Sequence, residues 1–236
     1  ANAENTWDGN VSAFATAAGV RQTADGYSIG TIDLVNSGDI SATATANATA
    51  TSDGYNVFAS ANATGVAQTA GYYSGLGQAT ASVDNSGNIT ATANALADDA
   101  YYANDAYATA NAWGVYQYVD GNVATADVYN TGDITATAMA TGEKSTYGYS
   151  YTATGYAYAA GVEQVAYGDD ATLTVTNHGN ITATATANAY ASENYRADAT
   201  AYASGVYQYG AADINTLVVD NHGTIEATAN AHGTGG

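Results

Sequence analysis

The chain contains no cysteine and no proline, and only 3 of its 236 residues are lysine or arginine. The lack of cysteine excludes disulfide bonds and structural metal sites built on thiolates. Because 22 residues are aspartate or glutamate, the formal net charge is −19, and a field of this sign repels nucleic acid and anionic membrane surfaces. We expect no nucleic acid among its partners, and the charge suits solubility, cation binding or a location outside the cell.

Long apolar runs and large aliphatic side chains are scarce as well. No run approaches the roughly 18 apolar residues of a membrane span, so no span is predicted. The hydrophobic content of 46% consists largely of alanine and tyrosine, which argues against a thick core of large side chains. Residue 1 is alanine and no signal peptide is visible, so we interpret the sequence as a mature or excised form.

Sequence signatures of catalysis are missing too. There is no nucleophile motif, phosphate-binding loop or metalloprotease motif. The aspartates are spread among predicted loops instead of being clustered on one face. We therefore predict no enzyme activity, no catalytic residues and no cofactor.

What the chain does have is strict alternation, which is clearest over residues 181–192. After Ile181 every second residue is alanine, and the residues between them are Thr, Asn, Tyr or Ser. A period of two places alternate side chains on opposite sides of an extended strand, whereas a helix would spread them around its circumference. The repeated threonines also favour the strand. The stretch therefore predicts a β-strand with an alanine face.

Two sequence anchors recur five times. The first is N-x-G-x-I, with steps of 49, 45, 47 and 44 residues, and the second is G-V-x-Q, with steps of 46, 49, 47 and 44. A period of about 46 residues is typical of an array in which each unit stacks on the next. The anchors contain Asn36, Asn85, Asn130, Asn177 and Asn221, and Gln22, Gln68, Gln117, Gln164 and Gln208.

The repeat predicts an all-β fold: a parallel β-solenoid, or β-helix, of five repeats over residues 1–231, followed by a flexible tail over 232–236. We interpret each repeat as one flat coil with two long sides and one short side, right-handed as parallel crossovers usually are. Two smaller coils per repeat remain the alternative. The best copy of the unit comprises a strand over 181–192, a turn over 193–196, a strand over 197–209, a loop over 210–215, a strand over 216–221 and a turn at 222–223.

Parallel stacking would bring equivalent residues of successive repeats about 4.8 Å apart. Asparagine and glutamine suit such ladders because each amide can donate to one neighbour and accept from the other. The two alanine faces would form a thin core, with the sheets closer than the usual ~10 Å and a larger residue forcing them apart. A threonine ladder of Thr43, Thr92, Thr137, Thr184 and Thr228 would run beside the amide ladders.

The two ends of the array look alike. By repeat phase, Ala1-Asn2-Ala3 and Ala229-Asn230-Ala231 fall at equivalent positions, and no distinct end caps are visible. Solenoids normally need caps against edge pairing. Two interpretations stay open: the chain is a slice of a longer array, or its ends stack on neighbouring molecules to form a filament.

A short pattern at the repeat turns carries a family resemblance. It reads Val35-Asn36-Ser37-Gly38-Asp39-Ile40, and it recurs with one more residue in Val83–Ile89 and Val175–Ile181. This pattern resembles the rungs of autotransporter-type and filamentous-haemagglutinin-type β-helix passengers. The resemblance implies a secreted bacterial surface protein, an adhesin or a stalk. The long, regular Ala-Thr strands favour a structural fibre.

Tyrosine is the most abundant aromatic residue, with 21 copies. Tyr116 and Tyr118 flank one repeated glutamine, and Tyr207 and Tyr209 flank another. If they are exposed, they would form an aromatic surface for sugar rings or for neighbouring filaments. The alternative is that tyrosine fills the corners of the coil and covers strand faces.

Sites for cations are the remaining hypotheses about ligands. His178 and His222 occupy the same turn position in successive repeats, so a stacked pair could bind a metal or simply form part of the turn. The pairs Asp98-Asp99 and Asp169-Asp170 are expected in loops, where calcium binding is an alternative to a solvated acidic surface. No glycine-rich calcium repeat is present.

Threonine in alternate positions also suggests a flat lattice of hydroxyl groups, as in ice-binding solenoids. The lattice is interrupted, because its third row reads Thr45, Asn94, Met139, Thr186 and Asn230.

Together these observations predict a non-enzymatic, extracellular protein that forms a filament or surface stalk by end-to-end self-association. The alternative is an adhesin segment that binds carbohydrate or a host surface through a Tyr/Thr-rich face, and ice binding is a minor one.

Overall fold

The computed structural model describes residues 1–5, 9–26, 28–51, 56–71, 77–99, 105–144, 152–192 and 195–235. These residues form strands and turns and include no helix. Every strand pairs with its neighbours in parallel. The predicted all-β, parallel architecture is therefore confirmed.

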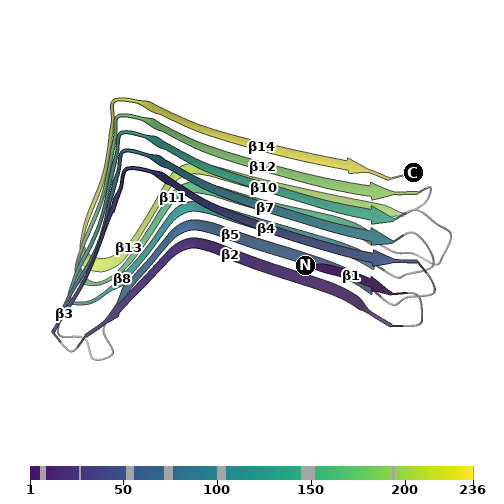
Figure 1. Cartoon of the computed structure of the whole chain (residues 1–236), viewed down its shortest axis with the longest axis horizontal. Helices are drawn as coiled ribbons and strands as arrows, with labels where there is room; N and C mark the ends of the chain where they lie inside the picture. Colours follow the sequence, from purple (N-terminus) through teal and green to yellow (C-terminus); the bar gives the residue numbers. More distant parts are fainter. Residues whose placement is uncertain are drawn as a thin grey trace.

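Six strands form one sheet, in which the alternating Ala-Thr stretches lie side by side (Figure 1). In spatial order they are β1 (Asn2–Asn5), β4 (Asp39–Ala50), β7 (Asn88–Asp99), β10 (Asp133–Lys144), β12 (Asn180–Ala191) and β14 (Thr224–Thr234). The last strand extends further than predicted, because residues 232–234, expected in a flexible tail, pair with β12.

The other eight strands form a second sheet that bends between a long arm and a short arm (Figure 1). They are β2 (Val11–Asp25), β3 (Ile29–Asn36), β5 (Asn56–Gly71), β6 (Gln78–Asn85), β8 (Asp105–Asp120), β9 (Val123–Asn130), β11 (Thr152–Asn177) and β13 (Arg196–Asn221).

A loop over 210–215 was predicted, and it is replaced by continuous strand in β13. Ala211 and Ala212 stay in register with Tyr167 and Gly168 of β11, so the ladder continues through the corner. Asn215 closes the corner by donating from Nδ2 to the Ala212 carbonyl at 2.7 Å. Backbone pairing with β11 therefore outweighs the turn preference of residues 210–215. The predicted turn at 193–196 falls partly on residues outside the described ranges.

Successive strands of each sheet are related by one register. Ile134, for example, pairs with Ile89 on one side and Ile181 on the other. We call the strands at one level a layer: β2 to β4, β5 to β7, β8 to β10, β11 with β12, and β13 with β14. The first layer contains β2 to β4, the last contains β13 and β14, and we call equivalent residues of successive layers a column.

Alanine faces of the two sheets form the core along the long arm. Buried alanines from β4, β7, β10 and β12 pack against those of β2, β5, β8 and β11. The sheets approach closely, since a Cβ atom on Gly142 of β10 would lie 2.5 Å from the Thr154 carbonyl oxygen of β11. Where the second sheet bends, larger side chains from valine and isoleucine fill the interior.

The bend explains why the two sequence anchors recur together. The glycine of G-V-x-Q packs against the isoleucine that follows N-x-G. A Cβ atom on Gly65 would lie 2.5 Å from Ile89 Cγ2 and 2.6 Å from the Gly114 carbonyl oxygen. Any side chain there would push the isoleucine out of the core.

Candidate functional site

The repeated asparagines form a hydrogen-bonded column at the turn between the sheets. Each donates from Nδ2 to the carbonyl of the glycine two residues on, as Asn85 does to Gly87 at 2.9 Å. Each of the first four also donates to Oδ1 of the asparagine in the following layer: 2.7 Å from Asn36 to Asn85, 2.7 Å from Asn85 to Asn130, 2.8 Å from Asn130 to Asn177 and 2.8 Å from Asn177 to Asn221.

The repeated glutamines form a second column, which runs in the opposite direction. Each of the last four donates from Nε2 to Oε1 of the glutamine in the preceding layer: 2.9 Å from Gln68 to Gln22, 2.8 Å from Gln117 to Gln68, 2.8 Å from Gln164 to Gln117 and 2.8 Å from Gln208 to Gln164. Gln117 is fully buried and also donates to the carbonyls of Ala81 at 3.2 Å and Asp127 at 3.1 Å.

The threonine column lies on the outer face of the first sheet. Its members, Thr43, Thr92, Thr137, Thr184 and Thr228, are paired in register. The neighbouring row of Thr45, Asn94, Met139, Thr186 and Asn230 is also in register, and Met139 is 45% exposed within it. Ice binding would need this row to be a regular hydroxyl lattice, which a thioether interrupts.

The columns leave unlike amide groups on the first and last layers. In the last layer Asn221 Nδ2 donates to the Gly223 carbonyl, and its second hydrogen has no acceptor among the described residues. In the first layer Asn36 Oδ1 accepts, from the described residues, one bond of 3.3 Å from the Gly38 N–H of its own turn. The glutamine column has the opposite polarity. Its terminal donor group, Gln22 Nε2, lies on the first layer, and its terminal acceptor, Gln208 Oε1, lies on the last layer.

Among the described residues, large apolar side chains are exposed mainly on these two layers. On the first layer they are Phe14, Ile29 and Val35, and on the last they are Tyr202, Tyr207, Tyr209, Ile214, Leu217, Val218 and Val219. Ile29 and Ile214 belong to one column. The outer layers therefore present apolar surface as well as unpaired strand edges.

The observed register corrects the predicted equivalence of the two ends. Asn2 pairs with Asn47, and that column continues through Asn188 to His232. Asn230 lies two residues earlier, opposite Thr186. The prediction counted one end from the G-V-x-Q anchor and the other end from the N-x-G-x-I anchor. The two counts disagree because the number of residues between the anchors varies from repeat to repeat.

An aromatic pocket lies on the outer side of the bend. Its lining residues are Asn111, Trp113, Tyr156, Tyr158, Glu163, Tyr202, Ala203, Ser204 and Tyr207. Glu163 Oε2 accepts a hydrogen bond from Trp113 Nε1 at 2.8 Å and another from the Tyr158 hydroxyl at 2.7 Å. The Trp113 and Tyr158 ring centroids are 5.7 Å apart. Burial, and then the hydrogen bond to Glu163, raise the pKa of Tyr158.

The structure separates the four predicted tyrosines. Tyr116 and Tyr207 lie in one column with Glu163 between them, and Tyr118 and Tyr209 lie in another. Tyr207 lines the aromatic pocket. Tyr167 links the other column, with ring centroids 5.7 Å from Tyr118 and 6.1 Å from Tyr209.

Sequence reasoning missed the centre of the pocket. Trp113 immediately precedes the glycine of an anchor, and Glu163 lies two residues after the next copy of that glycine. Aligning the repeats would have placed them in neighbouring layers, three columns apart. Each residue occurs in only one repeat, so no recurring motif marks it. The alignment of the repeats was therefore the only signal in the sequence that could have found the pair.

A buried ion pair joins two middle layers. Lys144 Nζ lies 2.5 Å from Asp99 Oδ2, and both side chains are fully buried. Asp98 points to the opposite face of β7, so the predicted Asp98-Asp99 pair cannot converge on one calcium ion. Both residues end a strand instead of lying in a loop. Asp169 and Asp170 are exposed within β11.

His178 and His222 stack face to face, with ring centroids 4.9 Å apart and an interplanar angle of 8°. Ring nitrogens coordinate metals through lone pairs in the ring plane, so parallel stacked rings do not converge on one ion. Among the described residues, no group of three or more His, Asp or Glu side chains could hold a metal.

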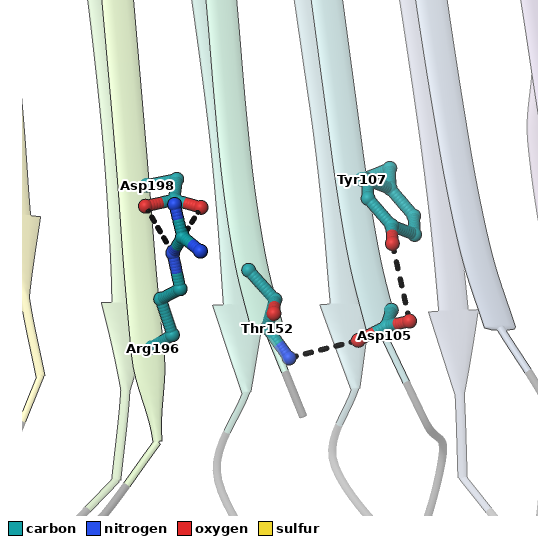
Figure 2. Close-up of polar contacts among 5 residues, drawn as sticks. All are labelled: Asp105, Tyr107, Thr152, Arg196 and Asp198. Carbon is teal, nitrogen blue, oxygen red and sulfur yellow. Dashed lines mark hydrogen bonds and ion pairs between the residues drawn. The ribbon is translucent and has the colours of Figure 1, made fainter. Parts of the chain in front are cut away.

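Polar contacts also tie the strand starts together, as Figure 2 shows. Asp105 accepts hydrogen bonds from the Thr152 backbone N–H at 2.8 Å and from the Tyr107 hydroxyl at 3.1 Å. In the last layer the exposed Arg196 forms an ion pair with Asp198 at 2.7 Å.

Searches against family models, curated proteins and solved structures found no match to this chain. The resemblance to autotransporter and haemagglutinin passengers therefore stays a prediction. No helix capable of crossing a membrane is found in the described part of the chain.

Proposed function

We propose that the chain is a right-handed parallel β-solenoid of five repeats of about 46 residues, and that copies stack end to end into an extracellular, non-enzymatic filament or stalk. The observation that carries this proposal is the complementarity of the first and last layers. The single-coil interpretation is supported by paired residues that are 44 to 49 positions apart in both amide columns.

Side chains at the junction would continue both columns without reversal. When a second copy is placed in register on the last layer, Asn221 Nδ2 faces Asn36 Oδ1 of that copy. Gln22 Nε2 of the same copy faces Gln208 Oε1. Each amide nitrogen with a second hydrogen therefore meets an amide oxygen with a second lone pair, and the opposite stacking polarity would bring like groups together.

Backbone and apolar groups support the same junction. The edge of β13 carries residues equivalent to all of β2 and β3, which are 15 and 8 residues long. Stacking would satisfy the unpaired backbone groups of both edges, which are otherwise templates for strand addition. It would also bury Leu217 and Val219, whose counterparts Leu173 and Val175 are fully buried one layer inside.

Microscopy with a pair of charged variants tests this proposal. The unmodified 236-residue chain should form long uniform fibres visible by negative stain. Leu217→Lys should abolish them by placing an ammonium group in the junction. Met139→Lys adds the same charge on the outer face of a middle layer and should leave the fibres intact. Dispersed short rods from the unmodified chain, or fibres from both variants, would refute end-to-end stacking.

The aromatic pocket favours a second candidate function, carbohydrate binding by an adhesin segment. Aromatic faces stack on sugar rings, and Glu163 Oε1 remains available to accept from a sugar hydroxyl because both fixed bonds reach Oε2. Titration with the neutral oligosaccharides cellohexaose and chitohexaose tests this function. Trp113→Ala should weaken binding at least tenfold, Tyr129→Ala on another column should not, and equal affinity for all three proteins would contradict it.

A further inference from the structure

The aromatic pocket contains a carboxylate that no cationic side chain of the described residues neutralises. Both fixed hydrogen bonds of Glu163, from Trp113 and Tyr158, come from uncharged donors. Of the 3 lysine and arginine residues in the chain, two pair with other carboxylates. The third, Arg21, shares the column of Glu163 but lies three layers away and forms no ion pair with it. Burial, and then the charge of Glu163, raise the pKa of the neighbouring Tyr116, so the local field favours a positive charge.

The hydrogen-bonding groups that the pocket offers to a ligand are mainly acceptors. Its ring donors already bond to Glu163. Asn111 Nδ2 donates to Asn62 Oδ1 at 2.8 Å, and the Ser204 hydroxyl donates to the Val206 carbonyl at 3.0 Å. Glu163 Oε1, Asn111 Oδ1 and a lone pair on Ser204 Oγ are left to accept. A protonated primary amine suits this set, because it combines a positive charge with three N–H donors.

Aromatic rings from three consecutive layers surround these acceptors. Trp113 of β8 lies 5.7 Å from Tyr158 of β11 between ring centroids. Tyr156 of β11 lies 5.8 Å from Tyr202 of β13, measured in the same way, and the exposed Tyr207 completes the lining. Ring faces attract a cation that lies within about 6 Å of the centroid. They also stack on the apolar faces of sugar rings.

The size of the pocket argues against a small amine as the whole ligand. Its volume is about 860 Å³, which lies within the range of about 300–1,000 Å³ that is usual for small-molecule sites. An alkylamine would leave most of the ring faces uncovered, whereas pyranose rings would cover them. A quaternary ammonium group, which aromatic cages also bind, has no N–H to offer to the acceptors. The lining therefore favours a primary amine carried on a sugar.

We infer that the aromatic pocket binds an N-deacetylated amino sugar, such as a glucosamine unit of an oligosaccharide, with its ammonium group at Glu163 Oε1 and its ring stacked on the neighbouring aromatic faces. This inference rests on the carbohydrate-binding function proposed above and specifies its ligand. The N-acetylated form of the same sugar has no positive charge, so it keeps the stacking and loses the attraction to Glu163.

Two oligosaccharides that differ only in acetylation test this inference. Chitohexaose and its fully deacetylated form, hexaglucosamine, are titrated calorimetrically into the 236-residue chain at a pH at which the amine is protonated. The unmodified protein should bind hexaglucosamine at least about tenfold more tightly, because a hydrogen bond between two charged groups is stronger than one between neutral groups. Glu163→Gln should remove this preference and leave the affinity for chitohexaose nearly unchanged, since its amide oxygen can still accept from Trp113 and Tyr158.

Asp84→Asn is the matched control. It removes the same charge from an exposed position on β6, a strand that contributes no residue to the pocket, and it should keep the full preference for hexaglucosamine. An equal loss of preference in Glu163→Gln and Asp84→Asn would show that the net charge of −19 attracts the cation without the pocket, and would overturn the inference.

The unmodified protein provides the remaining outcomes. Equal affinity for the two oligosaccharides would overturn the ammonium site while leaving carbohydrate binding in place, and no binding of either would remove both. Raising the pH above the pKa of the sugar amine should abolish the preference, because the neutral amine has lost its charge. A preference that persists after the amine is neutral would contradict the role of Glu163.

Discussion

Leu173 and Leu217 occupy the same column in neighbouring layers, yet Leu173 is fully buried and Leu217 is 46% exposed. Val175 and Val219 differ in the same way. The residue type and the column are the same within each pair, so the difference comes only from whether another layer lies above. Burial here is a property of stacking, because the side chains of the last described layer have no further layer above them.

The largest expected contrast involves ion pairs. Asp99→Ala should lower the free energy of unfolding by about 3–5 kcal/mol, because it leaves the buried ammonium of Lys144 without its carboxylate. Arg196→Ala removes one partner of an exposed pair in the last layer and should lower the free energy of unfolding far less, because solvent screens the attraction between exposed charges. Urea denaturation of the unassembled protein measures both. Replacing Asp99 and Lys144 together with Leu and Met should cost far less than Asp99→Ala, and equal losses would contradict the account.

The leucine pair gives the next contrast. Leu173→Ala should cost about 2–5 kcal/mol because it opens a cavity in a closed layer. Leu217→Ala should cost well under half of that in the monomer, since its side chain is already in contact with water. Thermal unfolding of dilute protein measures the difference. In assembled protein the two costs should become similar, and a persistent difference in filaments would indicate that the last layer stays open to solvent.

The glutamine column offers a smaller contrast. Gln117→Ala removes the amide that donates to Gln68 Oε1 and to two carbonyls, and should cost about 1–3 kcal/mol. Gln164 Nε2 loses one acceptor but keeps its bonds to the Ala126 and Thr174 carbonyls. Gln208→Ala removes hydrogen bonds in the last layer, where water can replace them, and should therefore cost less. Hydrogen exchange of the backbone amides near the bend should increase around layer three for the first variant only. Equal destabilisation by both variants would show that the column does not depend on burial.

The smallest effect is a dependence on pH. Burial raises the pKa of Asp127, opposed by a hydrogen bond with Thr174. A carboxyl group whose folded pKa exceeds its unfolded value opposes folding when it is ionised, so its penalty applies above the folded pKa and disappears as the pH falls below the unfolded value. Asp127→Asn should therefore stabilise the fold near neutral pH and lose that advantage in acid. Asp33→Asn, in the same column but exposed in the first layer, is the matched control, and a gain for Asp127→Asn that grew in acid would contradict this assignment.

Periodicity was enough to predict the parallel strands, their alanine faces and the residues of the three columns. Each follows from local alternation plus a spacing that repeats. The aromatic pocket was not predictable in this way, because Trp113 and Glu163 each occur once and become neighbours only through the register of β8 and β11. The corner at 210–215 was predicted wrongly because backbone pairing with a neighbouring layer outweighs local turn preference. The direction of each amide column also depends on side-chain geometry that spacing does not encode.

The central claim is that the last layer of one copy continues in register into the first layer of the next. Val35 and Asp220 are exposed and share a column, so Val35→Cys combined with Asp220→Cys tests this claim directly. Column neighbours lie about 4.8 Å apart, which allows a disulfide. Oxidation should link the chains into a covalent ladder, while Val35→Cys with Val218→Cys, displaced by two residues, should link few. A ladder from the displaced pair, or none from the in-register pair in visible filaments, would contradict the account.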